Sequence, residues 1–579
     1  MVDADRNGDV DSQTESQLSA KATAEQVRKR VVFVGIDGAT WEIIEPMVAE
    51  GRLPNLAAMM REGSYGPLRS TYPPNSSLAW SSFLTGVDPG KHGVFFFREQ
   101  CPGSYKRPVI SFDSIQAPSI FNLASAAGRK VVSAWMPLTY PPEQVNGVMI
   151  AGLLTPDAQA DFITPKSVRA ELEQRHGRIP SDNEPELLFH TADAEQALNC
   201  LLETTDKITE VAIDLLERED PDLFVVVFRG VDLASHQSWC FQDPAWARKN
   251  PAAAARQRHV LGMVYERVDA ALGRIVAVAA ELEGEVSVGV CSDHGFGAIS
   301  HRFFINKWLI DNGWLVLKKG SGGFGRLRLL LEKKWAGLMR RTGIAKKRMQ
   351  RGKGIGRDPE AAIRDMIDWS QTRAWSSFSG GEDIVLVNLK GREPEGIVEP
   401  GAEYEDLRSE IIVALEKVRG DDGTQLITKA YRREDLWSGP QLHLAPDIQY
   451  ITHETSVNSC ANPLHPRVSE PAVEGRPAMH RIDGVYLWQG AGVFRAGSME
   501  KGPRITDMAA TIMHLLGLPV DDHMDGVVME QCFEADWLRS NPVQMRHGTV
   551  VLSPREVAAS TTDDDEKLIE TMRALGYME

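Results

Sequence analysis

The feature that most constrains the fold of this chain is a set of three apolar, β-branched runs, each of which ends near an Asp or His side chain. Residues 31–36, 223–228 and 286–291 read VVFVGI, LFVVVF and VSVGVC, and each precedes an acidic or imidazole side chain by a few positions at most. Continuous apolar runs of this length are typical of parallel strands buried on both faces. Helical patterns at 192–217 and 253–282 separate them. Strands that alternate with helices predict an α/β fold with a mostly parallel central sheet.

The composition is that of an ordinary globular protein. Apolar residues make up 42% of the chain and charged residues 25%, which excludes a wholly disordered, collagen-like or coiled-coil chain. With 80 acidic and 64 basic residues the net charge is −16, so we expect no nucleic acid partner. The six cysteines form no CxxC pair, the first twenty residues are polar, and no run reaches the ~18 apolar residues of a spanning helix. These features predict a cytoplasmic protein.

Changes in composition divide the chain into five segments. Residues 1–28 are polar and aperiodic, which predicts a disordered tail. An α/β core is expected in two parts, at 29–310 and 446–535, with an inserted cap region at 311–445 between them. Residues 536–579 form a C-terminal extension whose role the sequence does not indicate.

Within the inserted region, residues 318–353 carry 13 Lys or Arg and a single acid, Glu332. Leu327, Leu331 and Trp335 recur at helical spacing, which predicts a basic amphipathic helix. One interpretation is a solvated helix packed by its apolar stripe. The other is contact with an anionic membrane surface or a polyanionic substrate, so a peripheral location at the membrane is the alternative to a fully soluble protein.

Six Asp and His side chains flank the predicted strand ends: Asp37, Asp232, His236, Asp293, His294 and His480. In open parallel sheets the functional crevice lies at the carboxyl ends of the strands, so we expect these side chains to converge. Their oxygen and nitrogen donors suit Zn²⁺, or else Mn²⁺, better than Ca²⁺. Each feature alone has an ordinary explanation as a turn or helix cap. Their joint occurrence favours a site for two divalent metal ions.

The segment between the first strand and the rest of the core contains a candidate nucleophile. Pro73 and Pro74 impose an extended backbone, after which Asn75 or a neighbouring Ser can cap a helix that runs to Thr85. A hydroxyl at a helix N-terminus lies where a phosphoryl group binds, and an adjacent metal ion would lower the pKa of that hydroxyl. The alternative is that these serines serve only as helix caps.

Together these motifs, in this order, resemble the alkaline phosphatase superfamily. Within it the chain is most similar to the type I phosphodiesterase/nucleotide pyrophosphatase family, in particular its bacterial phosphohydrolase or phosphomutase branch. Further matching segments lie at 388–397, 505–519 and 524–526, and the resemblance spans about residues 30–530. It implies a three-layer fold with helices on both faces of the sheet, an inserted cap, and metal-dependent cleavage of a phosphodiester or pyrophosphate.

The resemblance also implies a role for each site residue. Asp37, Asp293, His294 and the nucleophile would hold one metal ion, and Asp232, His236 and His480 the other. The family nucleophile lies nine residues before the Thr of a Thr-Gly pair, here Thr85, which selects Ser76 over Ser77 and Thr71. His480 is preferred to His465 because a strand follows it. Asn75 and Arg229 are the candidate substrate contacts. Ser76 would form a phosphoseryl intermediate that water then hydrolyses.

The chain departs from the family in one position. Nucleotide pyrophosphatases carry an Asn where Phe97 stands here, so nucleotide specificity does not follow from the resemblance. A sulfatase is disfavoured because no Cys/Ser-x-Pro-x-Arg motif occurs, and the 186 residues between His294 and His480 disfavour a phosphoglycerate mutase. The expected substrate is a phosphate-ester small molecule or a lipid headgroup. A phosphotransferase or phosphomutase, and a membrane-surface binding protein without turnover, are the alternatives.

Overall fold

The computed structural model describes residues 27–182, 194–239, 248, 251, 259–319, 359–378, 381–472 and 478–548. The predicted tail at 1–28 and the basic segment at 318–353 therefore lie almost entirely outside the described residues, as does most of the C-terminal extension.

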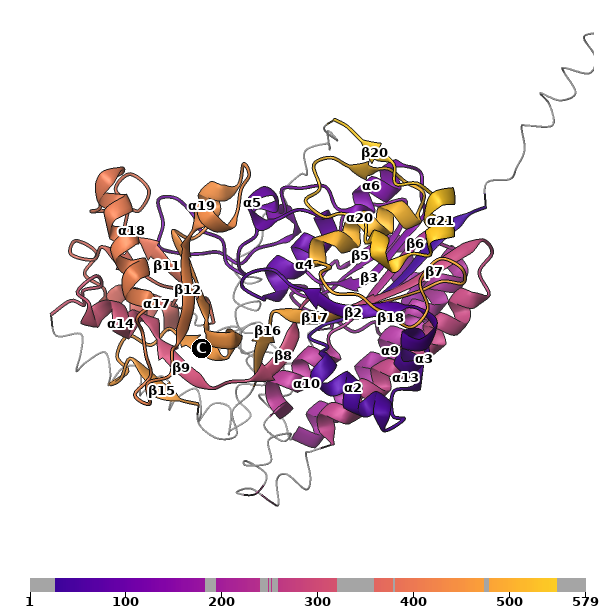
Figure 1. Cartoon of the computed structure of the whole chain (residues 1–579), viewed down its shortest axis with the longest axis horizontal. Coiled ribbons are helices and arrows are strands. Elements are labelled where there is room, and N and C mark those ends of the chain that lie inside the picture. Colours follow the sequence, from indigo (N-terminus) through magenta and orange to yellow (C-terminus); the bar gives the residue numbers. More distant parts are fainter. Residues whose placement is uncertain are drawn as a thin grey trace, which may run out of the picture.

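A nine-stranded sheet forms the centre of the larger unit (Figure 1). Its order is β18-β2-β17-β7-β1-β6-β3-β4-β5. The strands are β1 (Lys29–Ile36), β2 (Ser64–Arg69), β3 (Val131–Met136), β4 (Gly147–Ala151), β5 (Ile163–Thr164), β6 (Leu223–Phe228), β7 (Glu285–Cys291), β17 (Asp483–Gln489) and β18 (Ser498–Met499). The five strands from β7 to β4 are parallel, whereas β17 is antiparallel to its two neighbours and β5 to β4. The predicted mostly parallel sheet is confirmed.

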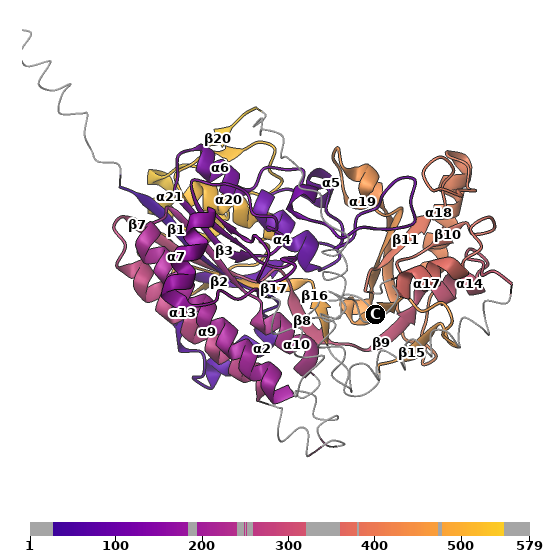
Figure 2. The same cartoon turned by 180° about the vertical axis from the view of Figure 1, so that it is seen from behind.

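Helices cover both faces of this sheet (Figures 1 and 2). One face carries α2 (Trp41–Ala49), α3 (Pro54–Glu62), α9 (Ala194–Glu219), α10 (Gly230–Ser238) and α13 (Val260–Ala280). The other carries α4 (Ser76–Thr85), α6 (Ile120–Ala126), α20 (Ile505–Leu515) and α21 (Ala535–Ser540). Helix α13 follows from its sequence, because buried apolar residues recur every three or four positions along it. The three-layer arrangement is as predicted.

A second, smaller unit is built on an antiparallel sheet with its own hydrophobic core. Its strand order is β10-β11-β13-β12. The strands are β10 (Ala374–Trp375), β11 (Ile384–Val387), β12 (Ile427–Arg432) and β13 (Ile448–Thr452), and the helices around them are α14 (Ile305–Asp311), α17 (Pro359–Met366), α18 (Ala402–Leu415) and α19 (Arg433–Leu436). Strand β13 follows residue 445, the predicted end of the inserted region; the segment boundaries themselves stay predictions.

Three small sheets of the described residues lie between or beside these units. In the first, β8 (Gly295–Ala298) pairs with β16 (Ala478–Arg481). In the second, β9 (His301–Phe304) lies between β14 (Val457–Cys460) and β15 (Ser469–Pro471). In the third, β19 (Val520–Asp521) pairs with β20 (Met545–Arg546). Two further α-helices are α5 (Pro89–His92) and α7 (Lys166–His176).

The loop after α5 ties the second unit to the first. Phe95 and Phe96 pack in the core of the second unit, while Phe97, the next residue, packs in the core of the first. Arg98 forms an ion pair with Glu360 of α17 at 2.9 Å, and both side chains are buried. These contacts make the loop a buried connection rather than a surface excursion.

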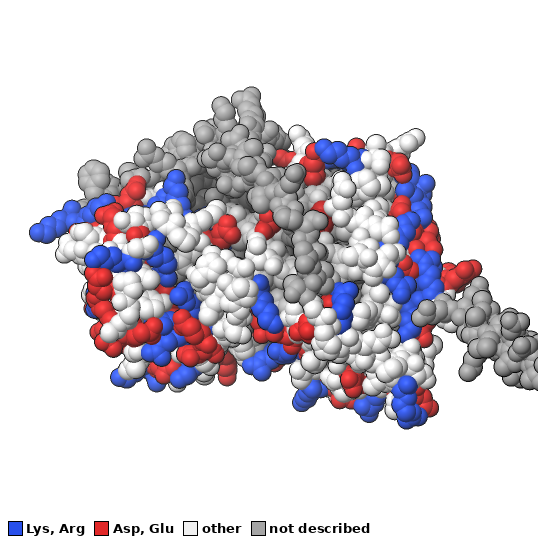
Figure 3. All heavy atoms as spheres, turned by 90° about the horizontal axis from the view of Figure 1, so that it is seen from above, with Lys and Arg blue, Asp and Glu red and all other residues white. Residues whose placement is uncertain are grey.

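Figure 3 shows basic and acidic side chains interspersed on one face of the molecule. No helix in the described ranges is both long and apolar enough to cross a bilayer. The predicted membrane contact and the predicted location both stay predictions, since the segment that motivates the first is not described.

Candidate active site

The sheet register brings the predicted site residues to one edge. Strand β1 pairs in parallel with both β6 and β7, with Ile36 opposite Phe228 and Gly35 opposite Cys291. Asp37 therefore lies at the carboxyl end of β1, between the start of α10 and the turn that bears Asp293 and His294. His480 comes from the far part of the chain and stands opposite Phe296 in the β8–β16 pair.

Asp232, His236 and His480 form one compact donor triangle. Asp232 Oδ1 lies 3.5 Å from His236 Nε2 and 3.6 Å from His480 Nε2, and the two Nε2 atoms are 3.1 Å apart. The point equidistant from these three atoms is ~2.0 Å from each, which is the length of a Zn–N or Zn–O bond. His480 Nδ1 donates to the carbonyl of Pro74 at 2.9 Å, so its Nε2 lone pair faces the triangle.

Asp37, Asp293 and His294 form a second group beside Ser76. Ser76 Oγ and Asp293 Oδ2 lie 3.1 and 3.2 Å from His294 Nε2, and Asp37 Oδ1 lies 4.0 Å from it. The other oxygen of each carboxylate accepts a hydrogen bond at 3.1 Å, Asp37 Oδ2 from Trp80 Nε1 and Asp293 Oδ1 from the backbone N–H of Gly38. Asp37 Oδ1 and Asp293 Oδ2 accept no hydrogen bond from the described residues, although both atoms are buried.

The electrostatics of the cluster favour bound cations. Burial, and then the charges of Asp293 and Asp232, raise the pKa of Asp37 well above its usual range. Burial and the charge of Asp232 raise the pKa of Asp293 to about 6. Burial lowers the pKa of His236 to about 4, so the imidazole is neutral at pH 7. Buried carboxylates and neutral imidazoles are the donors that divalent zinc or manganese requires, so the residues present fit two such ions.

The pKa values of Asp232 and His294 are both lowered. Burial disfavours the charge of Asp232, but the three neighbouring imidazoles outweigh it, and the pKa of Asp232 falls below its usual range. Burial, and then the proximity of His480, push the pKa of His294 well below its usual range. His294 belongs to two possible donor sets, one with Asp37 and Asp293 and the other with Asp232 and His480, and the donor atoms of each set lie within 4.8 Å of one another.

Helix α4 orients Ser76 and Ser77 differently. Asn75 is the N-cap of α4, and its Oδ1 accepts from the backbone N–H of Ser77 at 3.0 Å and from the Ser77 hydroxyl at 2.6 Å. The Ser77 hydroxyl is thus committed to the cap, while Ser76 Oγ faces His294. The Thr71 hydroxyl donates to the carbonyl of Pro73 at 3.0 Å. Of the predicted candidates, Ser76 is the one whose hydroxyl contacts the cluster.

The other predicted residues lie in different surroundings. His465 belongs to the second unit, where its ring stacks on Phe304 at 3.5 Å. Arg229 is 2% exposed, with Nε 4.0 Å from Asp37 Oδ2 and Nη1 3.6 Å from Asp182 Oδ2. Arg229 therefore lies next to Asp37 at the edge of the cluster. A substrate contact for Arg229 or for Asn75 stays a prediction.

Three residues of the site surroundings were not singled out from the sequence. Trp80 donates to Asp37, Phe296 packs against the imidazoles, and Gly38 donates its N–H to Asp293. Trp80 lies one helical turn after Ser76, which is a weak signal that it shares the same buried end of α4. Nothing local distinguishes Phe296 from an ordinary core residue.

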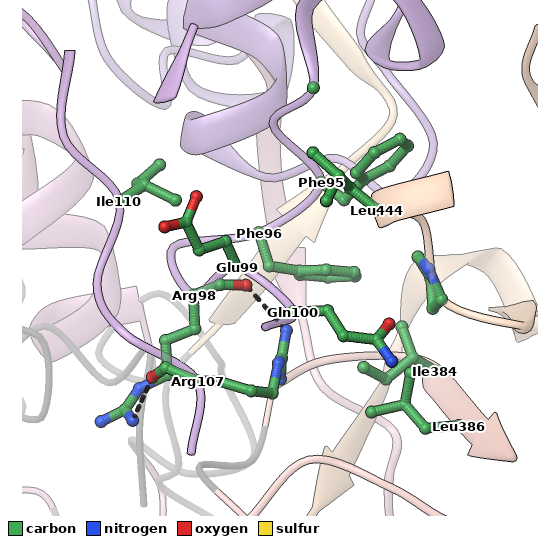
Figure 4. A pocket seen from close by; sticks show the side chains of 12 residues that line it. Phe95, Phe96, Arg98, Glu99, Gln100, Arg107, Ile110, Ile384, Leu386 and Leu444 are labelled. Atoms are coloured by element: carbon green, nitrogen blue, oxygen red, sulfur yellow. Dashed lines mark hydrogen bonds between the residues drawn. The ribbon is translucent and has the colours of Figure 1, made fainter. Parts of the chain in front are cut away.

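A separate hollow lies where the loop at 93–110 meets β11 (Figure 4). Arg98 and Arg107 exchange hydrogen bonds to each other's carbonyl groups there, at 3.0 and 2.8 Å. Both guanidinium groups also pair with glutamates of the second unit. Glu99 and Gln100 point to opposite sides of the hollow. Its polar groups do not converge, so the Asp/His cluster is the better candidate for chemistry.

Comparison with known proteins agrees with the motif order. Residues 31–463 match the family described as type I phosphodiesterase / nucleotide pyrophosphatase. The chain belongs to this family. The predicted resemblance is thus confirmed, and with it a hydrolase of the phosphodiesterase/pyrophosphatase type. No functionally curated protein matches this sequence.

Several solved structures are similar to this chain at low sequence identity. One is human ectonucleotide pyrophosphatase/phosphodiesterase 5, with a TM-score of 0.48 and 13% identity over 88% of this chain and 100% of that one. The murine protein in complex with AMP gives the same values. Phosphonoacetate hydrolase from Sinorhizobium meliloti 1021, in complex with phosphonoformate, has a TM-score of 0.49 and 13% identity over 85% of this chain and 95% of that one.

Proposed function

We propose that this chain hydrolyses a phosphate ester, preferentially a phosphodiester or a pyrophosphate, and that Ser76 is the nucleophile. The observation that carries the proposal is the position of Ser76 Oγ. It lies at the first turn of α4, 3.1 Å from His294 Nε2, in the group that Asp37 and Asp293 complete. The partial positive charge of a helix N-terminus favours the phosphoryl oxygens at the same place.

Two divalent ions are the proposed cofactors, with Zn²⁺ preferred and Mn²⁺ as the alternative. Asp37, Asp293, His294 and Ser76 would hold one ion. The triangle of Asp232, His236 and His480 would hold the other. Bound ions supply Lewis acidity and lower the pKa of a coordinated hydroxyl. The support lies in Asp37 Oδ1 and Asp293 Oδ2, which are buried and accept no hydrogen bond from the described residues. It lies also in the Nε2 atoms of His236 and His480, which share with Asp232 Oδ1 a common point at bonding distance.

The chain's own residues account for the covalent steps. Ser76 Oγ forms a bond to phosphorus while the ester oxygen leaves, so the charge passes from the serine oxygen to the leaving group. Water then attacks the phosphoseryl group, releases phosphate or a phosphate monoester, and restores the Ser76 hydroxyl. Asn75 keeps Ser77 turned away, so a single hydroxyl faces the cluster.

Turnover of two chromogenic esters tests the proposal. Bis(p-nitrophenyl) phosphate and p-nitrophenyl phosphate would be offered to dialysed protein, with and without added Zn²⁺ or Mn²⁺. We expect metal-dependent turnover with preference for the diester, and a loss of at least ~10³-fold in Ser76→Ala. Ser77→Ala, which removes a neighbouring hydroxyl that faces the cap instead, should retain turnover within ~10-fold.

Each result has a defined meaning. Activity in Ser76→Ala would show that the nucleophile is wrong. Recovery of the phosphoryl group on an added alcohol in place of inorganic phosphate would favour the phosphotransferase alternative. A lipid headgroup as substrate stays a prediction, and glycerophosphodiesters with and without acyl chains would separate that substrate from a soluble ester.

A further inference from the structure

One buried phenyl ring contacts all three histidines of the candidate active site. The Phe296 ring centroid lies 4.8 Å from that of His236, 5.2 Å from His480 and 5.9 Å from His294. The first two contacts are edge-to-face, with interplanar angles of 84° and 73°. The side chain is 1% exposed, and Trp239 lies behind it at 6.0 Å.

Phe296 also packs against the turn that follows Asp37. Gly38 has a φ of +70°, and a Cβ atom there would lie 3.1 Å from the Phe296 ring and 3.2 Å from the Cα of Asp232. The same Gly38 donates its N–H to Asp293. The ring therefore touches the four segments that bring Asp37, His236, His294 and His480 together, and the turn can come this close only without a side chain.

The histidine rings depend on packing for their orientation. A terminal imidazole torsion has broad preferences, so a ring whose Nε2 must point at a common centre needs steric walls or a second hydrogen bond. His480 and His294 have such bonds through Nδ1, to Pro74 and to Gly295. The Phe296 ring adds a steric wall that contacts all three imidazoles. Strands β8 and β16, which lie between the two units (Figures 1 and 2), place Phe296 directly opposite His480.

We propose that Phe296 is a positioning residue that pre-orients the three imidazoles for metal binding. The inference rests on the proposed two-metal function. It assigns Phe296 no contact with substrate or with the reacting atoms. Groups that orient metal ligands from outside typically change metal affinity by 10–100-fold when they are replaced, and we expect Phe296 to fall in that range.

Metal affinity of Phe296→Leu and Phe303→Leu tests this role. Phe303 is a matched control, since it is fully buried seven residues further on and packs against Tyr450 and Trp308 in the other core. Dissociation constants for Zn²⁺ and Mn²⁺ would be measured on metal-free full-length protein against a chromophoric chelator. We expect Phe296→Leu to bind 10–100-fold more weakly and Phe303→Leu to bind like wild type. Phe296→Met, which has about the volume of leucine but a flexible, unbranched side chain, should shift affinity in the same direction.

A second readout needs no metal and no turnover. In metal-free protein, ¹⁵N-edited NMR of the imidazole rings should show distinct, sharp signals for the site histidines in wild type and averaged ones in Phe296→Leu. Wild-type affinity and unchanged ring signals in Phe296→Leu would overturn the positioning role. The Asp232→Asn variant distinguishes failure of the proposed role of Phe296 from failure of the proposed two-metal site. If it also binds metal like wild type, the metal site itself is wrong, whereas loss there with retention in Phe296→Leu refutes only the role of Phe296.

Discussion

Replacement of Trp80 by Phe should weaken both the fold and the metal site through one hydrogen bond. The Trp80 side chain is fully buried, and its Nε1 donates to Asp37 Oδ2 at 3.1 Å. Trp488→Phe is the matched control. Trp488 is equally buried in the same core, stacks on Phe494 at 5.6 Å, and its Nε1 donates no hydrogen bond to any described residue.

The expected difference follows from that contrast. Both variants lose part of an indole ring and leave a cavity of similar size, so the packing loss largely cancels between them. Only Trp80→Phe also removes a hydrogen bond to a buried carboxylate, which contributes ~1.5–3 kcal/mol. The bond favours the ionised form of Asp37, so its loss raises the pKa of Asp37 further. Metal affinity should fall ~10–100-fold in Trp80→Phe and stay unchanged in Trp488→Phe.

Urea unfolding followed by far-ultraviolet circular dichroism measures the first quantity without reliance on tryptophan fluorescence. Chelator competition measures the second. Equal losses in the free energy of unfolding, together with wild-type metal affinity in Trp80→Phe, would refute the reasoning. Trp80 would then be an ordinary core residue that happens to adjoin Asp37.

Two further predictions concern charge. In metal-free protein, Asp293→Asn should gain stability relative to wild type as the pH rises from about 4 to 7, because the raised pKa of Asp293 means that its ionisation disfavours the folded state. With saturating Zn²⁺ the variant should be less stable than wild type. Urea midpoints of the two metal-free proteins that fail to diverge between pH 5 and pH 8 would contradict the prediction. Glu360→Gln should cost ~3–5 kcal/mol because it removes the charge that pairs with the buried Arg98. Lys166→Gln, which breaks an exposed pair with Asp161, should change the unfolding free energy little.

Much of the core could be predicted from local pattern. The strand that ends at Ile36, the strand that ends at Phe228 and the strand that ends at Cys291 are continuous apolar runs, and each is a central strand of the sheet. Because parallel strands end at one edge, the Asp and His side chains that follow them had to lie near one another. Ser76 at the start of α4 follows from the cap chemistry of Asn75.

Other parts of the site could not be predicted in this way. The insertion of antiparallel β17 between β7 and β2 carries no distinctive local pattern, because its apolar residues would suit either direction. Arg229 reads as a strand-end cation that could meet phosphate, yet the fold buries it between Asp37 and Asp182. The division of consecutive residues Phe96 and Phe97 between two cores likewise depends on the second unit being in place.

The sequence by itself determined the fold class and the family and supplied the six candidate Asp and His ligands, because strand pattern, cap chemistry and residue type act over a few positions along the chain. Only the tertiary structure decided which atoms share a centre. It committed the Ser77 hydroxyl to Asn75, directed Ser76 at His294, and placed Phe296 against three imidazoles from separate elements. Such contacts join residues up to hundreds of positions apart, and they exist only once close packing removes the space in which each ring could turn.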